Sequence, residues 1–308
     1  MSELLPGEFA IRTSDTNNYL SWLYDQSSGT GTVITSATTL GQTEKFKLTA
    51  WTPQFTLIQT LDGQNVTVAS EGGLTLIQPI EETSKFTLIG PYYGDGHCNI
   101  RTRYGPFVSA VDGGGQTSNA FLTDITTAHD WEAFSIVKSG DLGSGYRYAI
   151  RPFKTPNPFS LWLTANSGGG GGTLGAVSIS TPSSDGIFTL IRAEPPSSGG
   201  YVLQTGNGFN YLTSVNGGGL DGGDNLHTDA WKPLSWEVFN IVDQGDATYC
   251  IQTSSGFYLG YNPSPKSTSG TISTDIGTPD APPPGWITKF EFLMVRTPVH
   301  GDIVYALP

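Results

Sequence analysis

The chain of 308 residues carries 15 Lys and Arg against 27 Asp and Glu, which gives a formal net charge of −12. Partners held through phosphate contacts need basic residues, so we expect no nucleic acid and no acidic membrane surface as a partner. With 40 Gly and only 14% charged residues, the composition is unfavourable for helices and favours short strands joined by tight turns.

The first residues predict a protein made without a conventional secretion signal. The stretch MSELLPGEFAIRTS at 1–14 has no basic run and no apolar core of signal-peptide length. No apolar run reaches the length of a membrane span, so we expect a soluble protein, either cytoplasmic or released by another route. Cys98 and Cys250 lie far apart in the sequence, which predicts two buried, reduced thiols rather than a disulfide framework.

Six copies of a short phrase with a central Phe follow one another along the chain, at intervals of about 40 to 54 residues. They read EKFKL, SKFTL, WEAFSI, GIFTLI, WEVFNI and TKFEFL, around Phe46, Phe86, Phe134, Phe188, Phe239 and Phe290. A second phrase precedes each one by a near-constant distance, as AIRT, LIQT, NIRT, AIRP, VLQT and CIQT. Two anchors that recur in the same order predict six repeats whose Phe and Ile or Leu side chains form a common core.

Two further apolar runs lie between the anchors of each unit. In the third unit they are residues 107–111 and 120–125, and in the fifth they are 211–215 and 225–229. Each unit is therefore predicted to contain four turn-bounded strands of about five residues. No window of the sequence shows convincing helical periodicity.

The six units divide into two groups of three. Three four-stranded units closed around a threefold axis form a β-trefoil, and closure covers the apolar faces and strand edges that one unit leaves open. We therefore predict an all-β fold of two tandem β-trefoil domains, each of three four-stranded repeats. Domain 1 is expected over residues 1–140 and domain 2 over residues 141–308, with the Gly- and Ser-rich stretch 137–146 as a short linker.

Two glycine runs, SAVDGGG at 109–115 and TSVNGGG at 213–219, fall between the second and third strands of their units. A phosphate-binding loop needs a helix N-terminus after its glycines, whereas a strand is predicted after each of these runs. Asp112 and Asn216 precede the glycines, and this composition tolerates the positive φ of tight turns. The runs are therefore interpreted as turns.

The stretches FVSAVDGGG…WEAFSIV (107–137) and YLTSVNGGG…WEVFNIV (211–242) resemble the fascin-type β-trefoil repeat. That repeat pairs a YLSA-like strand and a Gly-rich hairpin with a closing strand of the W/F-E-x-F type. The resemblance is clear in the third and fifth units, partial in the first and sixth, and weak in the second and fourth. Trefoils of this type occur in actin bundlers, lectin-like proteins and ancillary modules of carbohydrate-active enzymes, so the resemblance constrains function loosely.

No motif in the sequence indicates a catalytic site or a cofactor-binding site. The chain has no GxSxG and no HExxH motif, and its four His residues show no metal-ligand spacing. We therefore predict that the protein is not an enzyme and uses no metal or other cofactor.

Three binding functions fit these features, and a non-catalytic, lectin-like protein of the defensive or toxin-associated kind is favoured, with glycans or glycoproteins as partners. Fascin-like actin crosslinking is the alternative, but it implies four trefoils with basic patches, and a charge of −12 repels acidic actin. A protease inhibitor would act through an exposed loop. Residues 262–270, with Lys266, and 277–286 are the longest irregular candidates.

A neutral sugar needs an aromatic face and side chains that hydrogen-bond its hydroxyl groups. The first candidate site lies in the fifth unit, where Trp231 would stack on the sugar, and comprises Asn210, Tyr211, Asn225, His227, Asp229 and Trp231. The second comprises Asn18, Tyr19 and Trp22. Core burial is the alternative for Tyr19, Trp22 and Tyr211, which lie in second strands. Trp131 and Trp236 belong to the repeated phrase WExF and are predicted to be structural.

Overall fold

The structure is a computed structural model that describes residues 7–25, 30–52, 54–93, 97–153, 161–171, 174–178, 183–193, 200–220, 225–263 and 269–295. These residues form 24 strands and seven short 3-10 turns, without an α-helix among them, which confirms the predicted all-β class. In this part of the chain, no helix has the length and apolar character that a membrane crossing requires.

The strands of the first half are β1 (Glu8–Thr13), β2 (Tyr19–Asp25), β3 (Thr30–Ala37), β4 (Lys45–Ala50), β5 (Thr56–Thr60), β6 (Asn65–Val68), β7 (Leu74–Ile77), β8 (Lys85–Tyr93), β9 (His97–Thr102), β10 (Phe107–Ala110), β11 (Phe121–Ile125) and β12 (Ala133–Ser139). Those of the second half are β13 (Tyr146–Pro152), β14 (Leu161–Ala165), β15 (Leu174–Ser178), β16 (Ile187–Arg192), β17 (Tyr201–Gln204), β18 (Tyr211–Ser214), β19 (Leu226–Ala230), β20 (Val238–Asp243), β21 (Tyr249–Gln252), β22 (Tyr258–Asn262), β23 (Ser269–Ile276) and β24 (Phe290–Met294). The 3-10 turns are η1 (Glu82–Ser84), η2 (Val111–Gly113), η3 (Asp130–Glu132), η4 (Asn166–Gly168), η5 (Ser184–Gly186), η6 (Val215–Gly217) and η7 (Ser235–Glu237).

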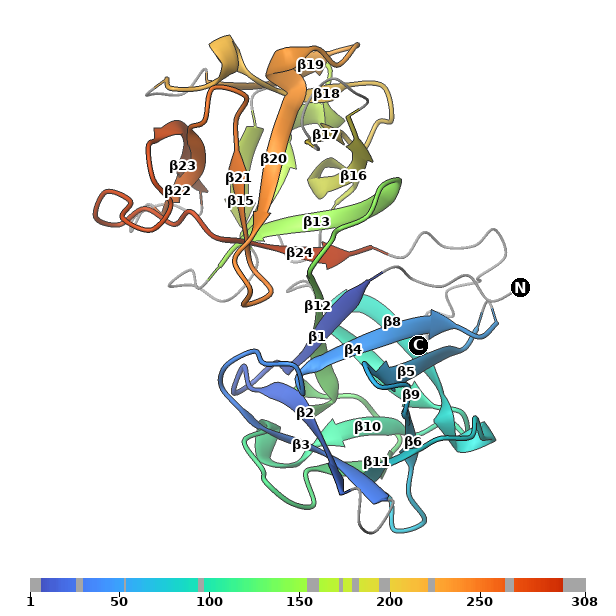
Figure 1. The fold of residues 1–308 in the computed structure, drawn as a ribbon. Helices are drawn as coiled ribbons and strands as arrows, with labels where there is room; N and C mark the ends of the chain where they lie inside the picture. Colours follow the sequence, from blue (N-terminus) through green and yellow to red (C-terminus); the bar gives the residue numbers. More distant parts are fainter. Residues whose placement is uncertain are drawn as a thin grey trace.

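Each half contains a closed, antiparallel six-stranded barrel (Figure 1). In the first half, pairing runs from β1 through β4, β5, β8, β9 and β12 back to β1. In the second half, it runs from β13 through β16, β17, β20, β21 and β24 back to β13. Closure leaves the barrel strands without free edges.

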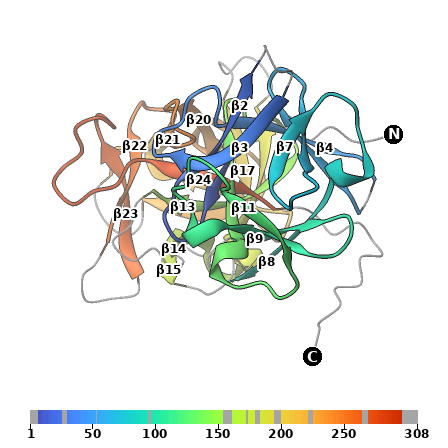
Figure 2. The same cartoon turned by 90° about the horizontal axis from the view of Figure 1, so that it is seen from below.

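The remaining strands form three hairpins in each half: β2–β3, β6–β7 and β10–β11 in the first, and β14–β15, β18–β19 and β22–β23 in the second. Figure 2 views the molecule from the end at which first-half hairpins lie. A six-stranded barrel with three hairpins is the strand arrangement of a β-trefoil. The division into domains 1–140 and 141–308 remains a prediction.

The repeated anchors form the two cores. All six anchor Phe residues are fully buried, which confirms their predicted place in the interior. The anchor Ile and Leu residues are buried as well, and each half has its own large apolar cluster. The repeat in the sequence therefore corresponds to equivalent inward-facing positions on the barrel strands.

The acid of the recurring WExF phrase, rather than its Trp, is the buried residue. Glu132 and Glu237 are buried, and each accepts a hydrogen bond at 2.6 Å from the backbone N–H three residues earlier, that of His129 or Leu234. Trp131 and Trp236 are each 45% exposed and so lie only partly in the interior. The phrase recurs because the carboxylate closes the turn that leads into the last strand of a unit.

The glycine runs form turns, as predicted, and they also pack closely against the next unit. Asn216 has a φ of 55°, and Gly218, with a φ of 103°, lies so near Thr253 that an added Cβ would come within 2.5 Å of its Oγ1. The N–H of Gly219 then donates to the carbonyl of Thr274 at 2.8 Å. The run therefore joins β18–β19 to the neighbouring β22–β23 hairpin.

The two halves meet along β1, β12 and β24 (Figure 1). Val137 of β12 pairs with Leu293 of β24. The buried Glu291 carboxylate accepts hydrogen bonds from Arg12 of the first half and, at 2.7 Å, from Arg151 of the second half. This ion triad crosses the contact between the barrels.

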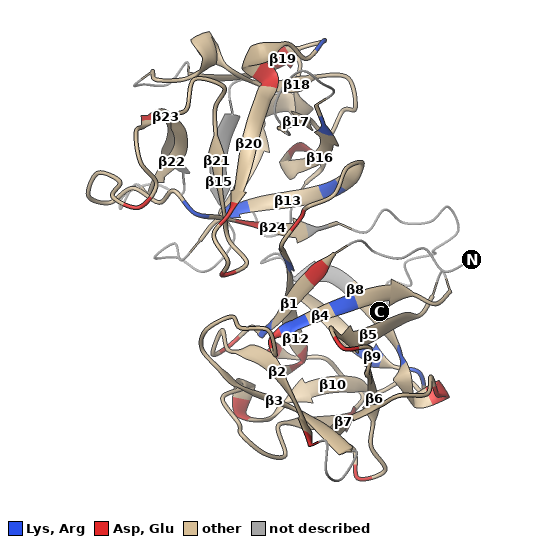
Figure 3. Ribbon diagram, in the orientation of Figure 1, with Lys and Arg blue, Asp and Glu red and all other residues tan. Residues whose placement is uncertain are grey.

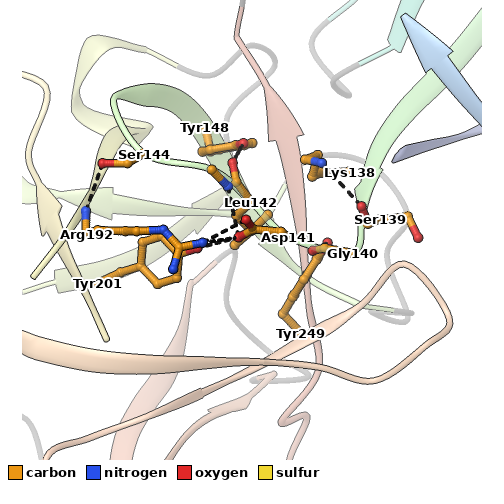
Figure 4. A network of polar contacts seen from close by, with 11 residues as sticks. Lys138, Ser139, Gly140, Asp141, Leu142, Ser144, Tyr148, Arg192, Tyr201 and Tyr249 are labelled. Carbon is orange, nitrogen blue, oxygen red and sulfur yellow. Dashed lines mark hydrogen bonds and ion pairs between the residues drawn. The ribbon is translucent and has the colours of Figure 1, made fainter. Parts of the chain in front are cut away.

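Tyrosine hydroxyl groups of the second barrel donate hydrogen bonds to the predicted linker (Figure 4). The hydroxyl of Tyr249 donates to the Gly140 carbonyl at 2.8 Å, and that of Tyr201 donates to Asp141 Oδ1 at 2.7 Å. Tyr148 donates to the Leu142 carbonyl. These three tyrosines pair with the anchor Phe residues of successive units, so each unit of the second barrel contributes one contact to this segment.

Candidate functional site

The candidate glycan site of the fifth unit is built on the β18–β19 hairpin, in which Tyr211 pairs with Ala230. Side chains alternate along β19, so Leu226 and Thr228 are buried while His227 and Asp229 reach solvent. Trp231 directly follows the strand and is 81% exposed.

The turn before β18 presents a second aromatic ring. Asn207 Oδ1 accepts hydrogen bonds from the N–H groups of Phe209 at 2.8 Å and Asn210 at 3.1 Å, an arrangement that fixes the turn. Phe209 is left 78% exposed. Because Asn210 Nδ2 donates to the Asp229 carbonyl at 3.2 Å, this turn and the end of β19 lie together.

Polar side chains lie beside these rings. His227 Nδ1 is 4.0 Å from Asp229 Oδ1, and both side chains are well exposed. Two exposed aromatic rings therefore lie at the open end of the hairpin. The Asp229 carboxylate and the His227 imidazole, which can hydrogen-bond a ligand, lie along β19 between that end and the tip.

Asn225 is not part of this surface. Its side chain is buried, and Nδ2 donates to the carbonyls of Leu220 and Ile272, at 3.3 Å in both cases. These bonds fix the hairpin to its neighbour, which corrects the prediction that Asn225 contacts a sugar. A buried amide that satisfies backbone carbonyls is a structural residue.

Asn210 and Tyr211 lie at the site but have internal partners. Asn210 Oδ1 accepts a hydrogen bond from Asn207 at 2.8 Å, in addition to the bond that its Nδ2 donates. Tyr211 is half-buried, and its hydroxyl lies 3.4 Å from Gln204 Nε2. We assign both residues to holding the turn in place.

The residues of the second candidate site do not form a common surface. Tyr19 is buried, and its hydroxyl donates at 3.4 Å to the Asp246 carbonyl of the other half. Trp22 packs against the first core and donates to the Lys45 carbonyl at 3.3 Å, while Asn18 is half-exposed in the turn before β2. This prediction is corrected, because Tyr19 belongs to the interior and Trp22 is partly buried against the core.

Comparison of equivalent hairpins separates shared from specific residues. Strand register aligns Asp229 with Asp124 of the third unit and Asp275 of the sixth. In the same alignment, Trp231 corresponds to Thr126 and Gly277. The aspartate is therefore a property of the repeat, whereas the exposed Trp is specific to the fifth unit.

Phe209 is the site residue that the sequence interpretation missed. The sixth unit spans QTSSGFY between its first and second strands, whereas the fifth spans QTGNGFNY, one residue longer. The sixth unit's Phe257 is half-buried beside Gly219, while Phe209 is exposed. The extra residue is a signal that sets this turn apart from that of the sixth unit, although the first unit, RTSDTNNY at 12–19, has the longer form as well.

The two candidate inhibitor loops differ in how much of each the structure describes. Residues 264–268, which include Lys266, lie outside the described residues. The loop at 277–286 is held by residues that follow it, since Thr288 donates to the Pro279 carbonyl at 2.9 Å and Ile287 pairs with Tyr261 of the β22–β23 hairpin. Across the described parts of the chain, no group of three or more His, Cys, Asp or Glu side chains could hold a metal ion.

No family model matches the sequence, and none of the curated proteins matches it either. Among solved structures, the chain is similar to a mosquitocidal holotoxin, with 12% identity and a TM-score of 0.39 over 93% of this chain and 34% of that one. It therefore spans about a third of the holotoxin's length.

Two smaller proteins each match about half of the chain. The designed threefold-symmetric protein ThreeFoil shows 13% identity and a TM-score of 0.39 over 43% of this chain and 99% of that one. SeviL, solved with asialo-GM1 saccharide, shows 9% identity and a TM-score of 0.34 over 44% and 98%. All three TM-scores lie below 0.5, and the trefoil arrangement rests instead on the strand pairing described above.

Proposed function

We propose that this chain is a non-catalytic, tandem β-trefoil protein that binds neutral or weakly charged glycans through the fifth unit. The observation that carries the proposal is the pair of exposed rings, Phe209 and Trp231, at one end of the β18–β19 hairpin. Aromatic side chains that are exposed together, rather than singly, are a feature of surfaces that contact a partner.

The chemistry around the rings favours a saccharide. An aromatic face accepts the C–H surface of a sugar, and the carboxylate of Asp229 and the imidazole of His227 can bind its hydroxyl groups. Asp229 and the net charge of −12 disfavour a strongly acidic ligand at this position.

The test is a glycan array screened with the purified chain and with Trp231→Ala and Asp229→Asn. Loss of the ring or of the charge-assisted hydrogen bond should weaken binding by about 1–3 kcal/mol, or roughly 5- to 150-fold. Trp131→Ala is the matched control, because Trp131 is also partly exposed but lies in the other half.

Actin co-sedimentation in parallel separates this proposal from the fascin-like alternative. We expect glycan binding that changes little with salt and no pelleting with filaments. An empty array together with salt-sensitive pelleting would replace the glycan proposal with actin binding.

A further inference from the structure

A separate surface of the first half combines cationic and aromatic side chains. We call it the basic aromatic cluster: Trp51, Phe55, Glu82, Lys85 and Arg103. Trp51 and Phe55 lie in the turn between β4 and β5, where the N–H of Trp51 donates to the Phe55 carbonyl at 2.8 Å. Lys85 begins β8, and Arg103 directly follows β9.

Each cation of the cluster lies over one of the rings. Lys85 Nζ is 5.6 Å from the centre of the Trp51 ring, and the Arg103 guanidinium carbon is 4.5 Å from that of Phe55. These distances are those of cation–π interactions, and such interactions help to fix the positions of the two charged groups.

Both cations converge on one carboxylate. Lys85 Nζ pairs with Glu82 Oε1, and Arg103 Nε donates to Glu82 Oε2 at 3.1 Å. The hydrogen bond from Lys85, which has the larger effect, and the hydrogen bond from Arg103 both lower the pKa of the Glu82 carboxyl. The Glu82 side chain is more than half exposed, so a carboxylate is held here where a soluble ligand can compete for the same partners.

The cluster is cationic within an acidic protein. Figure 3 shows basic residues on β4, β8 and β9 of this half, and the exposed Arg101 pairs with Thr87 beside the cluster. Surface charges act over about 8 Å at physiological ionic strength, so a small anion at the cluster is affected mainly by these local cations and by the carboxylates of Glu81 and Glu82 beside them. A long polyanion would extend beyond them and meet the repulsion of a protein with a net charge of −12.

We infer that the basic aromatic cluster is a binding site for a small acidic saccharide, whose single carboxylate or sulfate takes the place of Glu82 between Lys85 and Arg103. The Trp51 ring, which is partly exposed, offers the apolar face for the sugar. Glu82 thus acts as an internal competitor for the ligand anion. This site uses residues of the first half alone and does not rest on the glycan site of the fifth unit.

The test is titration of the full chain with 3′-sialyllactose, a sulfated lactose and neutral lactose, followed by calorimetry or NMR. We expect Glu82→Gln to bind an acidic probe about 5- to 10-fold more tightly than the parent, because the competitor has lost its charge. Comparison of the two acidic probes distinguishes carboxylate from sulfate as the preferred anion.

Three further variants make the outcome specific. Arg103→Gln should abolish acidic-probe binding, while Glu71→Gln, which changes an exposed carboxylate outside the cluster, should leave it unchanged. Trp231→Ala should also leave it unchanged, so failure of one site is distinguishable from failure of the other. Equal binding of lactose, no gain in Glu82→Gln, or a preference for a long sulfated polymer would each overturn the inference.

Discussion

The smallest determinants of this fold are polar side chains that sequence patterns treat as surface residues. Glu237 is the clearest case, because it is buried and both oxygens have partners. Thr213 donates to Oε1 at 2.8 Å, and the N–H of Leu234 donates to Oε2 at 2.6 Å. The carboxylate therefore links the turn before β20 to the second strand of the same unit.

Glu237→Gln should destabilise the protein by about 1.5–3 kcal/mol, since two hydrogen bonds to a buried charged group are weakened or lost. Urea unfolding of the parent and the variant measures this difference. Glu71→Gln, at an exposed position, should stay within about 0.5 kcal/mol of the parent. Equal effects of the two substitutions would contradict the role assigned to Glu237.

Lys138 gives a prediction for alkaline pH. Burial lowers its pKa to about 8, against the opposing effect of Asp141, Glu8 and Asp243. Between about pH 8 and 10.5 the unfolded chain binds more protons at this group than the folded one, so this residue's contribution to stability increases as pH rises.

Relative to Lys138→Met, the parent should therefore gain up to about 3 kcal/mol of stability between pH 7.5 and 10.5. The measurement is chemical unfolding of both proteins across this pH range, in which other titrating groups cancel. A difference that does not change with pH would show that the lysine titrates normally.

For single residues, the sequence predicted the buried apolar anchors, but it did not predict which polar side chains are buried. Repetition identified the six buried Phe residues because every unit needs the same inward-facing position filled. Asn225 and His227 lie two positions apart in one predicted strand, yet the first is buried and the second reaches solvent. The strand's period of two cannot distinguish them, since the fate of Asn225 depends on the carbonyls of Leu220 and Ile272.

At the scale of elements, the hairpins depend on how closely their turns approach the next unit. Gly218 and Gly245 both have a positive φ, of 103° and 77°. An added Cβ at Gly218 would lie 2.5 Å from Thr253 Oγ1, whereas at Gly245 it would meet nothing within 4 Å. Comparison of substitutions at these two glycines therefore separates the cost of a strained backbone from the cost of crowding by a neighbouring side chain.

Gly218→Ala should therefore lower stability by about 1–3 kcal/mol more than Gly245→Ala, because only the former forces the hairpins apart. Thermal and urea unfolding of the two variants give the comparison. A similar loss in both would mean that positive φ alone explains the glycine run.

Strand positions were well predicted from the sequence, whereas the side chains that the turns expose to solvent were not. The anchors locate β4, β8, β12, β16, β20 and β24 because buried strands carry a strong apolar signal. The ring of Phe209 is exposed by an Asn207-centred turn with one extra residue, and nothing in the apolar pattern reports such a turn.

For the whole molecule, the two barrels are joined by an ion triad that repetition could not reveal. Arg12 and Arg151 occupy the position that is Gln59, Gln204 and Gln252 in three other units. Gln204 and Gln252 hold their own turns by donating to the carbonyls of Gly208 and Gly256, at 2.8 Å and 3.0 Å. The two arginines instead bind Glu291 at the contact between barrels.

The triad predicts loss of stability in acid. Burial opposes ionisation of Glu291, but Arg12 and Arg151 outweigh it and lower the pKa of the carboxyl. The stabilisation is therefore complete above the ordinary pKa of 4.5 and is lost as pH falls through the lower folded value.

Glu291→Gln should cost about 3–5 kcal/mol at pH 7, because it leaves two buried guanidinium groups without their counter-charge. The difference from the parent should shrink as pH falls from 5 toward 2, and urea unfolding at several pH values measures it. A deficit that is constant down to pH 2 would contradict the assigned role of the charge.

The position of β24 also sets an order of events during synthesis. All six strands of the first barrel precede residue 140, so that barrel can close while later residues are still being added. The second barrel has to wait for β24, which pairs with β13 and β21 and also supplies Glu291. Until then Arg12 lacks its partner on a finished barrel, so a ribosome paused between the halves would expose a folded intermediate in which this guanidinium has no Glu291 counter-charge.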